Sequence, residues 1–355
     1  MLLSSTRSIS TDYADRQRLL QLPGQRLPAA LTVLLVFGLV PCLANDYWFS
    51  AVLIPFLVLS LAGLGLNLLT GYAGQLSLGS AAFMSIGAFA SYNFAMRLPG
   101  LPLLASLTLG GLVTAVAGIL FGLPSARIRG FYLIVSTLAA QFLVEWVFTK
   151  FPWFSNNDPS GVISAPPLRI LGHEFSGPRG HYLLTAAIVS ALALLARNIV
   201  GSGVGRAWMA VRDMETAAAL SGIPVLRAKL LAFAISSFYL GIAGALWAFT
   251  YLGTVEPHGF DLHRSFQVLF IIIIGGLGSI AGNFFGAAFI VLLPILLSNL
   301  GSRLLGNHFN PGQLENFQNI LFGTLIIYFL IREPEGLARL FQGLRDRLRA
   351  WPLRQ

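Results

Sequence analysis

Long apolar runs without charge, separated by short polar or glycine-rich stretches, make up most of the chain. Because a transmembrane helix needs about 20 mostly apolar residues, cutting these runs at charges, prolines and glycine clusters predicts about ten spans. The predicted spans are 29–44, 51–69, 76–96, 101–124, 131–150, 181–199, 230–252, 266–280, 283–300 and 317–331. The sequence therefore predicts an all-α, polytopic membrane protein, with some helices broken at glycine-rich segments.

Two of the apolar runs are too long for a single helix, since Tyr47–Met96 and Phe266–Leu300 contain no charged residue. We expect each run to turn back on itself, at Gly71–Gly79 and at Gly275–Gly282. Both segments place glycines and small polar residues at membrane depth, which is tolerated only against protein or an aqueous cavity. The first segment is therefore either a helix break beside a permeation path or a tight cytoplasmic turn.

The basic residues indicate how the spans are oriented. Only 10% of the residues are charged, and the net charge is +9. Cytoplasmic loops of membrane proteins carry an excess of Lys and Arg, whereas acidic residues contribute little. With both termini in the cytoplasm, 17 of the 23 Lys and Arg residues fall in cytoplasmic segments, while the Asp and Glu residues divide 7 and 7. We therefore expect the positive charge to set the orientation rather than to bind nucleic acid.

This orientation predicts a multi-pass chain in three regions. A cytoplasmic N-terminal tail (1–28) precedes a transmembrane domain (29–331), and a basic cytoplasmic tail (332–355) follows it. The N-terminal tail is polar and mixed in charge, so no cleavable signal peptide is expected. Two polar segments interrupt the domain, an irregular outer loop at 152–180 and a cytoplasmic loop at 200–229.

The sequence lacks the motifs of several kinds of chemistry. A phosphate-binding loop needs Gly-Lys-Ser/Thr, but the two lysines, Lys150 and Lys229, follow Thr149 and Ala228. The single cysteine, Cys42, excludes a disulfide within the chain and a cysteine metal cluster. No pair of histidines has the short helical spacing of a zinc motif. We therefore predict that the chain is not an enzyme, has no catalytic residues, and holds no metal and no cofactor.

Ionisable residues within the predicted spans are scarce. Glu145 is the main candidate, and it lies near an outer end, where Lys150 or water can pair with it. A proton-driven carrier would be expected to contain more such groups. The polar residues at depth are neutral instead, and they either line a passage for a polar solute or hydrogen-bond between helices. The candidate path residues are Asn67, Thr70, Gly71, Gln75, Ser77, Gly275, Gly276 and Gly278.

The cytoplasmic loop contains a predicted short amphipathic helix, over 206–222. Apolar residues recur at i, i+3 and i+6 along Trp208–Met214, and Gly222-Ile-Pro224 is a helix stop signal. Such a helix lies on lipid or inserts into the groove of a partner. Acidic Asp213 and Glu215 among the arginines favour a protein partner.

Five phrases, in this order along the chain, resemble one family. They are Gly-Leu-Asn67-Leu-Leu-Thr-Gly71-Tyr-Ala-Gly74-Gln75-Leu-Ser77-Leu-Gly79, Ile128-Arg-Gly130-Phe-Tyr132-Leu, Gly205-Arg206 through Gly222-Ile, Lys229-Leu-Leu-Ala-Phe233 and Ile274-Gly-Gly-Leu-Gly278-Ser. Together they resemble the permeases of bacterial branched-chain amino acid ABC importers, in particular the M-type (LivM) subunit. The resemblance extends over residues 50–330, and it departs from the family at Ser80, where the family usually has His.

The resemblance implies the permease subunit of an ATP-binding-cassette importer for branched-chain, hydrophobic amino acids, in the bacterial inner (plasma) membrane. It implies a heterodimer with a second permease, two cytoplasmic ATPase subunits that hold ATP-Mg, and a periplasmic solute-binding protein. The stretch Glu215-x-Ala217-Ala218-x-x-x-Gly222 resembles the coupling loop that such permeases insert into the ATPases. The predicted coupling residues are Gly205, Arg206, Arg212, Glu215, Ala217, Ala218 and Gly222.

Three other interpretations stay open. An ABC permease for urea, short amides or aromatic acids would share these motifs, because selectivity is expected to rest largely with the binding protein. An ATP-independent secondary transporter would be expected to carry more charge within its spans. A membrane-embedded enzyme would need an acid, a base and a nucleophile that converge on one site.

Overall fold

The computed structural model describes residues 35–98, 100–127, 131–158, 162–165, 168–170, 173–174 and 177–304, together with 320–321, 323–324, 327–328 and 336–337. The chain forms two compact units, residues 1–45 and residues 46–355. In the first unit the described helical segments are η1 (Leu35–Leu39) and α3 (Val40–Leu43). The tail at 1–28 lies outside the described residues, as do most of the predicted last span and of the tail at 332–355.

The second unit contains the long apolar helices that the hydrophobic pattern predicts. In the described residues, 5 helices are long and apolar enough to cross a membrane: Asp46–Tyr72, Leu103–Pro124, Tyr132–Lys150, Pro178–Gly201 and Val225–Leu252. As helical elements they are α4 (Asp46–Trp48), η2 (Phe49–Leu53), α5 (Ile54–Asn67) and η3 (Leu68–Tyr72), then α7 (Leu103–Arg127), α8 (Phe131–Lys150), α9 (Pro178–Gly201), α12 (Val225–Leu246) and η4 (Trp247–Leu252). The predicted all-α membrane fold is confirmed.

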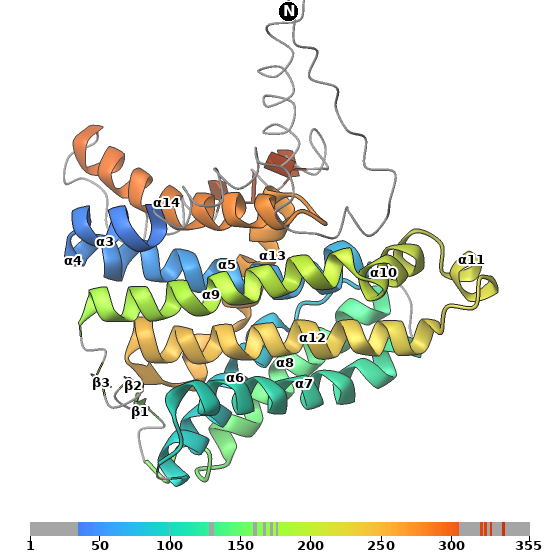
Figure 1. Cartoon of the computed structure of the whole chain (residues 1–355), viewed down its shortest axis with the longest axis horizontal. Coiled ribbons are helices and arrows are strands. Elements are labelled where there is room, and N and C mark those ends of the chain that lie inside the picture. The colour runs from blue at the N-terminus through green and yellow to red at the C-terminus, as the bar shows by residue number, and fades with distance from the viewer. Residues whose placement is uncertain are drawn as a thin grey trace, which may run out of the picture. The chain divides into compact units, whose positions relative to one another are not determined.

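The arrangement of these helices places α5 and α12 at the centre of the second unit. α5 is buried along almost its whole length, and α12 is buried along most of it. In Figure 1, α5, α9 and α12 run side by side, and α10 (Gly203–Asp213) and α11 (Glu215–Leu220) lie at one end of them. The two most buried helices therefore form the core, against which the more exposed α7 and α9 pack, while α8 packs on α6 and α7.

Three further apolar helices are offset from the predicted spans: α6 (Ser80–Arg97), α13 (Leu262–Gly275) and α14 (Ile280–Leu304). α13 has 14 residues. At about 1.5 Å per residue it is about 21 Å long, shorter than the hydrocarbon core of about 30 Å. The predicted segment 266–280 is therefore wrong in its bounds, because the helix begins at Leu262 and stops at the glycine-rich turn.

The N-termini of α6 and α13 meet beside the middle of α8. Gln141, halfway along α8, accepts a hydrogen bond from the backbone N–H of Ala82 at 2.6 Å. Ser265, in the first turn of α13, accepts one from the N–H of Ala81 at 2.9 Å and donates to Gln141 at 3.1 Å. These side chains satisfy N–H groups that a helix start leaves without an intrahelical partner. Both helices therefore begin inside the helix bundle rather than at its surface.

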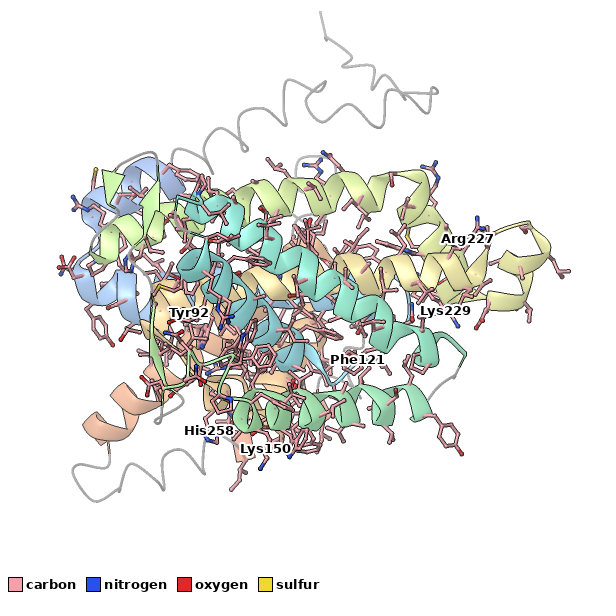
Figure 2. All side chains as sticks on the ribbon, turned by 90° about the horizontal axis from the view of Figure 1, so that it is seen from below. Tyr92, Phe121, Lys150, Arg227, Lys229 and His258 are labelled. Atoms are coloured by element: carbon pink, nitrogen blue, oxygen red, sulfur yellow. The ribbon has the colours of Figure 1, made fainter. Side chains whose placement is uncertain are left out.

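The loops sort into two groups at opposite ends of the second unit. Strand β1 (Ile163–Ser164) pairs with β4 (Thr254–Val255), which joins the α8–α9 loop to the segment before α13. A second pair, β2 (Arg169–Ile170) with β3 (His173–Glu174), lies within the α8–α9 loop. Figure 2 shows Arg227 and Lys229 at the end near α11, away from Tyr92, Lys150 and His258. This grouping is the one that alternating spans require.

Glycines allow the closest helix contact in the core, between α6 and α12. A Cβ atom at Gly244 would overlap the backbone carbonyl of Met84, and one at Gly87 would overlap the backbone of Gly241. Small residues at such crossings let two backbones approach closely, which is how membrane helices gain packing energy without a hydrophobic driving force between them.

We predict that Gly244→Ala destabilises the protein by about 1–3 kcal/mol, because the added methyl group must displace the backbone of α6. Thermal unfolding of the purified chain in detergent measures the effect. Gly201→Ala is the matched control, since nothing lies within 4 Å of a Cβ atom at that position. Equal melting temperatures for the two variants would contradict the close crossing.

Candidate coupling and permeation site

The candidate site lies at the α11 end, where the loop at 200–229 meets the two glycine-rich turns. The loop forms two helices instead of the single predicted helix at 206–222. They are separated at Met214, whose backbone is extended (φ −157°, ψ 94°). The prediction of one continuous helix is wrong, and neither glycine nor proline marks the break in the sequence.

α10 is fixed to the transmembrane domain by its apolar face. The indole N–H of Trp208, which is fully buried, donates to the carbonyl oxygen of Ala228 in α12 at 2.9 Å. Val211 is buried on the same face, but Met214 is 63% exposed. The predicted apolar stripe is therefore correct for its first two members and wrong for the third, because the helix ends before Met214.

Arg212 connects α10 to the end of the first transmembrane span. Its Nη1 atom donates to the carbonyl oxygen of Gly71 at 2.8 Å, and its Nε atom donates to Asp213 at 2.9 Å. Gly74, in the left-handed region at φ 70°, leaves room for this side chain, since a Cβ atom there would lie 2.7 Å from Cγ of Arg212. Arg212 thus satisfies a carbonyl that the end of η3 leaves open.

Asn67 joins the two glycine-rich segments. Its side chain accepts a hydrogen bond from the backbone N–H of Gly278 at 2.9 Å and donates to the carbonyl oxygen of Ser279 at 3.0 Å. Gly71 lies against both groups, because a Cβ atom there would overlap the Asn67 side chain and the Gly278 nitrogen. Two turns about 210 residues apart in sequence are therefore held together by one amide side chain, as the hydrogen-bond distances show.

The turn after α13 requires glycine. Gly276 and Gly278 have φ values of 110° and 74°, in the region that other residues rarely adopt. Gly275 packs directly on the backbone of Gly282. The predicted reversal at Gly275–Gly282 is confirmed, with α14 beginning at Ile280.

The remaining polar candidates of the first segment are buried and hydrogen-bonded within the protein. Thr70 donates to the carbonyl oxygen of Gln75 at 3.0 Å, and Ser77 accepts from the N–H of Gly79 at 3.3 Å. The amide nitrogen of Gln75 lies 3.5 Å from the carbonyl oxygen of Lys229. The Oε1 atom of Gln75 is buried without a partner in the described part of the chain. These bonds stabilise an irregular segment, residues 73–79, that enters the bundle before α6.

Glu215 begins α11 and forms an ion pair with Lys229 of α12, with an Oε1–Nζ distance of 3.0 Å. The Lys229 side chain is only 9% exposed. The sequence does not predict the pairing of Lys229 with Glu215, since 14 residues and two helix breaks separate them. No periodicity relates residues across such breaks, so the pair became visible only in the fold.

The other predicted coupling residues lie around α10 and α11. Gly205 packs on the backbone of Val200, and the exposed Arg206 donates to the carbonyl oxygen of Gly201 at 3.2 Å. Ala217 is exposed, Ala218 is buried, and Gly222 ends the region at φ 83° with open space around it.

The free surface of this region is apolar at its tip. Leu220, the last residue of α11, is 91% exposed, and Met214 is exposed beside the break between the two helices. Exposed large apolar side chains on a projecting helix are typical of a docking surface for another protein.

The structure also bears on metal binding and on Glu145. Within the described residues, no group of three or more His, Cys, Asp or Glu side chains is placed to hold a metal ion. Glu145 forms no ion pair in the described part of the chain, so the Lys150 alternative is wrong there.

Comparison with known proteins gives a consistent result. The family described as branched-chain amino acid transport system / permease component matches residues 49–330. The high-affinity branched-chain amino acid transport system permease protein LivM of Salmonella typhimurium is 32% identical over 300 residues, which is 78% of this chain and 66% of that protein. LivM of Escherichia coli K12 is 31% identical over 300 residues, again 78% of this chain and 66% of that protein.

The match to a more distant relative extends over more of that relative's length. The probable branched-chain amino acid transport permease protein LivM of Methanocaldococcus jannaschii is 24% identical over 330 residues, 81% of this chain and 92% of that protein. No solved structure matches the chain significantly. Because the family match covers most of the chain and the described helices are those of a polytopic membrane protein, the chain belongs to the permease components of branched-chain amino acid transport systems.

Proposed function

We propose that the chain is a permease subunit of an ATP-binding-cassette importer for branched-chain, hydrophobic amino acids, in the bacterial inner membrane with both termini cytoplasmic. A second permease subunit completes the pathway, two ATPase subunits supply the energy, and a periplasmic binding protein delivers the solute. The relatives named above support the substrate class. The contact that carries the mechanism is the hydrogen bond from Arg212 to Gly71, because it joins the projecting loop to a broken transmembrane segment.

The proposed coupling begins at the exposed tip of α11. A groove in an ATPase subunit covers Leu220, and closure of the ATPases displaces α11 together with the Glu215–Lys229 pair. Because Lys229 belongs to α12, this displacement also acts on the central helix of the bundle. The loop therefore has two proposed roles: its exposed tip docks on the ATPase, and its buried contacts transmit the movement to the transmembrane helices.

The inward transmission runs through hydrogen bonds that are already formed. Arg212 holds the end of η3 at Gly71, and four residues earlier Asn67 holds the turn at Gly278. Movement of α10 therefore shifts both glycine-rich segments together, at the end of the pathway where solute would be released. The neutral polar residues Thr70, Gln75 and Ser77 lie in the segment that moves.

Uptake measurements test the proposed function directly. The chain is co-purified with its partners, reconstituted with the binding protein, and assayed for radiolabelled leucine uptake. We expect a second permease and two ATPases to co-purify, and uptake to depend on ATP and to survive collapse of the proton gradient. Uptake by the chain alone without ATP would overturn the proposal in favour of a secondary transporter. Competition by urea or an aromatic acid, but not by valine, would reassign the substrate.

We predict that Arg212→Gln lowers ATP-driven uptake about tenfold or more, since a hydrogen bond to a charged donor is worth about 1.5–3 kcal/mol. ATP hydrolysis should lose its stimulation by loaded binding protein. Arg227→Gln, an exposed arginine at the same end, is the control and should leave uptake unchanged within about twofold. Equal uptake by both variants would remove Arg212 from the coupling route.

A charge exchange tests the second connection. Glu215→Lys places two cations together and should reduce stimulated ATP hydrolysis by about fivefold, the effect of about 1 kcal/mol. The double variant Glu215→Lys/Lys229→Glu should recover most of that loss, because the pair is re-formed with reversed sign. A double variant as defective as the single one would show that the pair has no part in coupling.

A further inference from the structure

Arg264 lies deeper in the protein than its sequence position suggests. The predicted spans 230–252 and 266–280 place it in the loop between them, but it belongs to the first turn of α13. Its neighbour Ser265 is hydrogen-bonded to Gln141, halfway along α8. The 3₁₀ segment η5 (Pro257–Phe260) leads into this turn, and Phe260 at its end is buried. The chain therefore enters the bundle from the outer end before α13 begins and carries the arginine with it.

The Arg264 guanidinium has an aromatic neighbour and an incomplete set of hydrogen bonds. Its central carbon lies 4.2 Å from the ring centroid of Trp247, and its Nη1 atom donates to Gln267. The Nε atom is buried and has no acceptor among the residues that the structure describes. Within the described residues Arg264 forms no ion pair, and Asp261 uses its carboxylate to accept the backbone N–H of Arg264 at 3.0 Å.

The aromatic neighbour also carries a hydrogen-bond donor that is unsatisfied among the described residues. The indole Nε1 atom of Trp247 is buried without an acceptor in the described part of the chain. Trp247 begins the π-helical segment η4, and the ring of Tyr251 lies 4.4 Å from its ring. Short π-helical segments within α-helices occur frequently at functional sites.

Two adjoining donors that are buried without an acceptor in the described ranges indicate which chemical group would fit between them. Each buried N–H group left unpaired costs about 1–3 kcal/mol, and a cation held among helices is expensive unless an anion pairs with it. A carboxylate has two acceptor oxygens and is the group that a planar guanidinium binds best. The exposed ring of Tyr251, whose centroid lies 4.4 Å from that of Trp247, supplies apolar surface next to that position.

We propose that Arg264 and Trp247 form a carboxylate-binding site on the path of the transported amino acid. The guanidinium binds the carboxylate of the solute, the indole N–H donates to it, and the aromatic faces contact its apolar side chain. This inference rests on the proposed function, since it assigns the site to the same solute.

A second arginine on a tryptophan provides an internal control. Arg97 lies 3.7 Å from the ring centroid of Trp153, but it is exposed, and it donates to the carbonyl oxygen of Trp153 at 2.8 Å. An arginine stacked on a tryptophan is therefore also present at the surface, where the guanidinium has a hydrogen-bond acceptor.

Leucine uptake by the reconstituted importer is compared at equal amounts of assembled complex. Arg264→Gln should reduce uptake about tenfold or more, and Trp247→Phe, which keeps a ring and removes the N–H, should reduce it about three- to tenfold. Arg97→Gln should remain within about twofold of the unaltered chain. Unchanged uptake in the Arg264 and Trp247 variants would overturn the site, and so would failure of both to assemble, which would assign the pair to the contact with the second permease.

Charge rescue separates binding from a structural role. Cys42 is the only cysteine, so Arg264→Cys in a Cys42→Ser chain can be modified selectively. A cationic aminoethyl methanethiosulfonate should restore part of the uptake, and the anionic sulfonatoethyl reagent should not. Equal effects of the two reagents, or no reaction with either, would overturn the proposal. Absence of leucine uptake by the unaltered complex would instead refute the proposed function.

Discussion

Every backbone N–H and C=O group within a membrane needs a partner inside the protein, and this constraint determines how the broken helices are built. The breaks at 73–79 and 276–279 leave helix ends whose backbone groups need partners from elsewhere in the protein. Side chains from distant elements satisfy them: Asn67 at the second turn, Arg212 at the end of η3, and Gln141 and Ser265 at the start of α6. These polar residues, which interrupt an otherwise apolar sequence, stabilise its irregular backbone.

Hydropathy predicted the long helices well, because each places about 20 apolar residues in one run, and that signal is local. It failed where an element was too short to fill such a window. α13 with its 14 residues and the stretch before it were divided incorrectly between helix and loop, which left Arg264 at the surface. The break at Met214 and the pairing of Glu215 with Lys229 had no local signal, since both depend on how α10 and α11 pack on α12.

The family motifs identified the cytoplasmic loop and the glycine-rich segments, but not what connects them. In the structure Arg212 reaches the transmembrane span, whereas Leu220 remains available to a partner. The sequence motifs alone do not distinguish these two kinds of residue. The fold distinguishes loop residues that are exposed from loop residues that contact the transmembrane helices, and it assigns Asn67 to the contact between two turns rather than to an isolated polar position.

α9 connects the two ends of the helix bundle mechanically. At its outer end Thr185 donates to Thr250 at 3.4 Å, and His181 lies 3.3 Å from the Thr250 carbonyl oxygen, in the same π-helical segment as Trp247. At its inner end it leads through Ser202 into α10. Its 24 residues form a rod of about 36 Å at about 1.5 Å per residue. A tilt of about 5° displaces the far end of such a lever by about 3 Å, so a movement at the α10 end of this helix is also transmitted to the end that contacts η4.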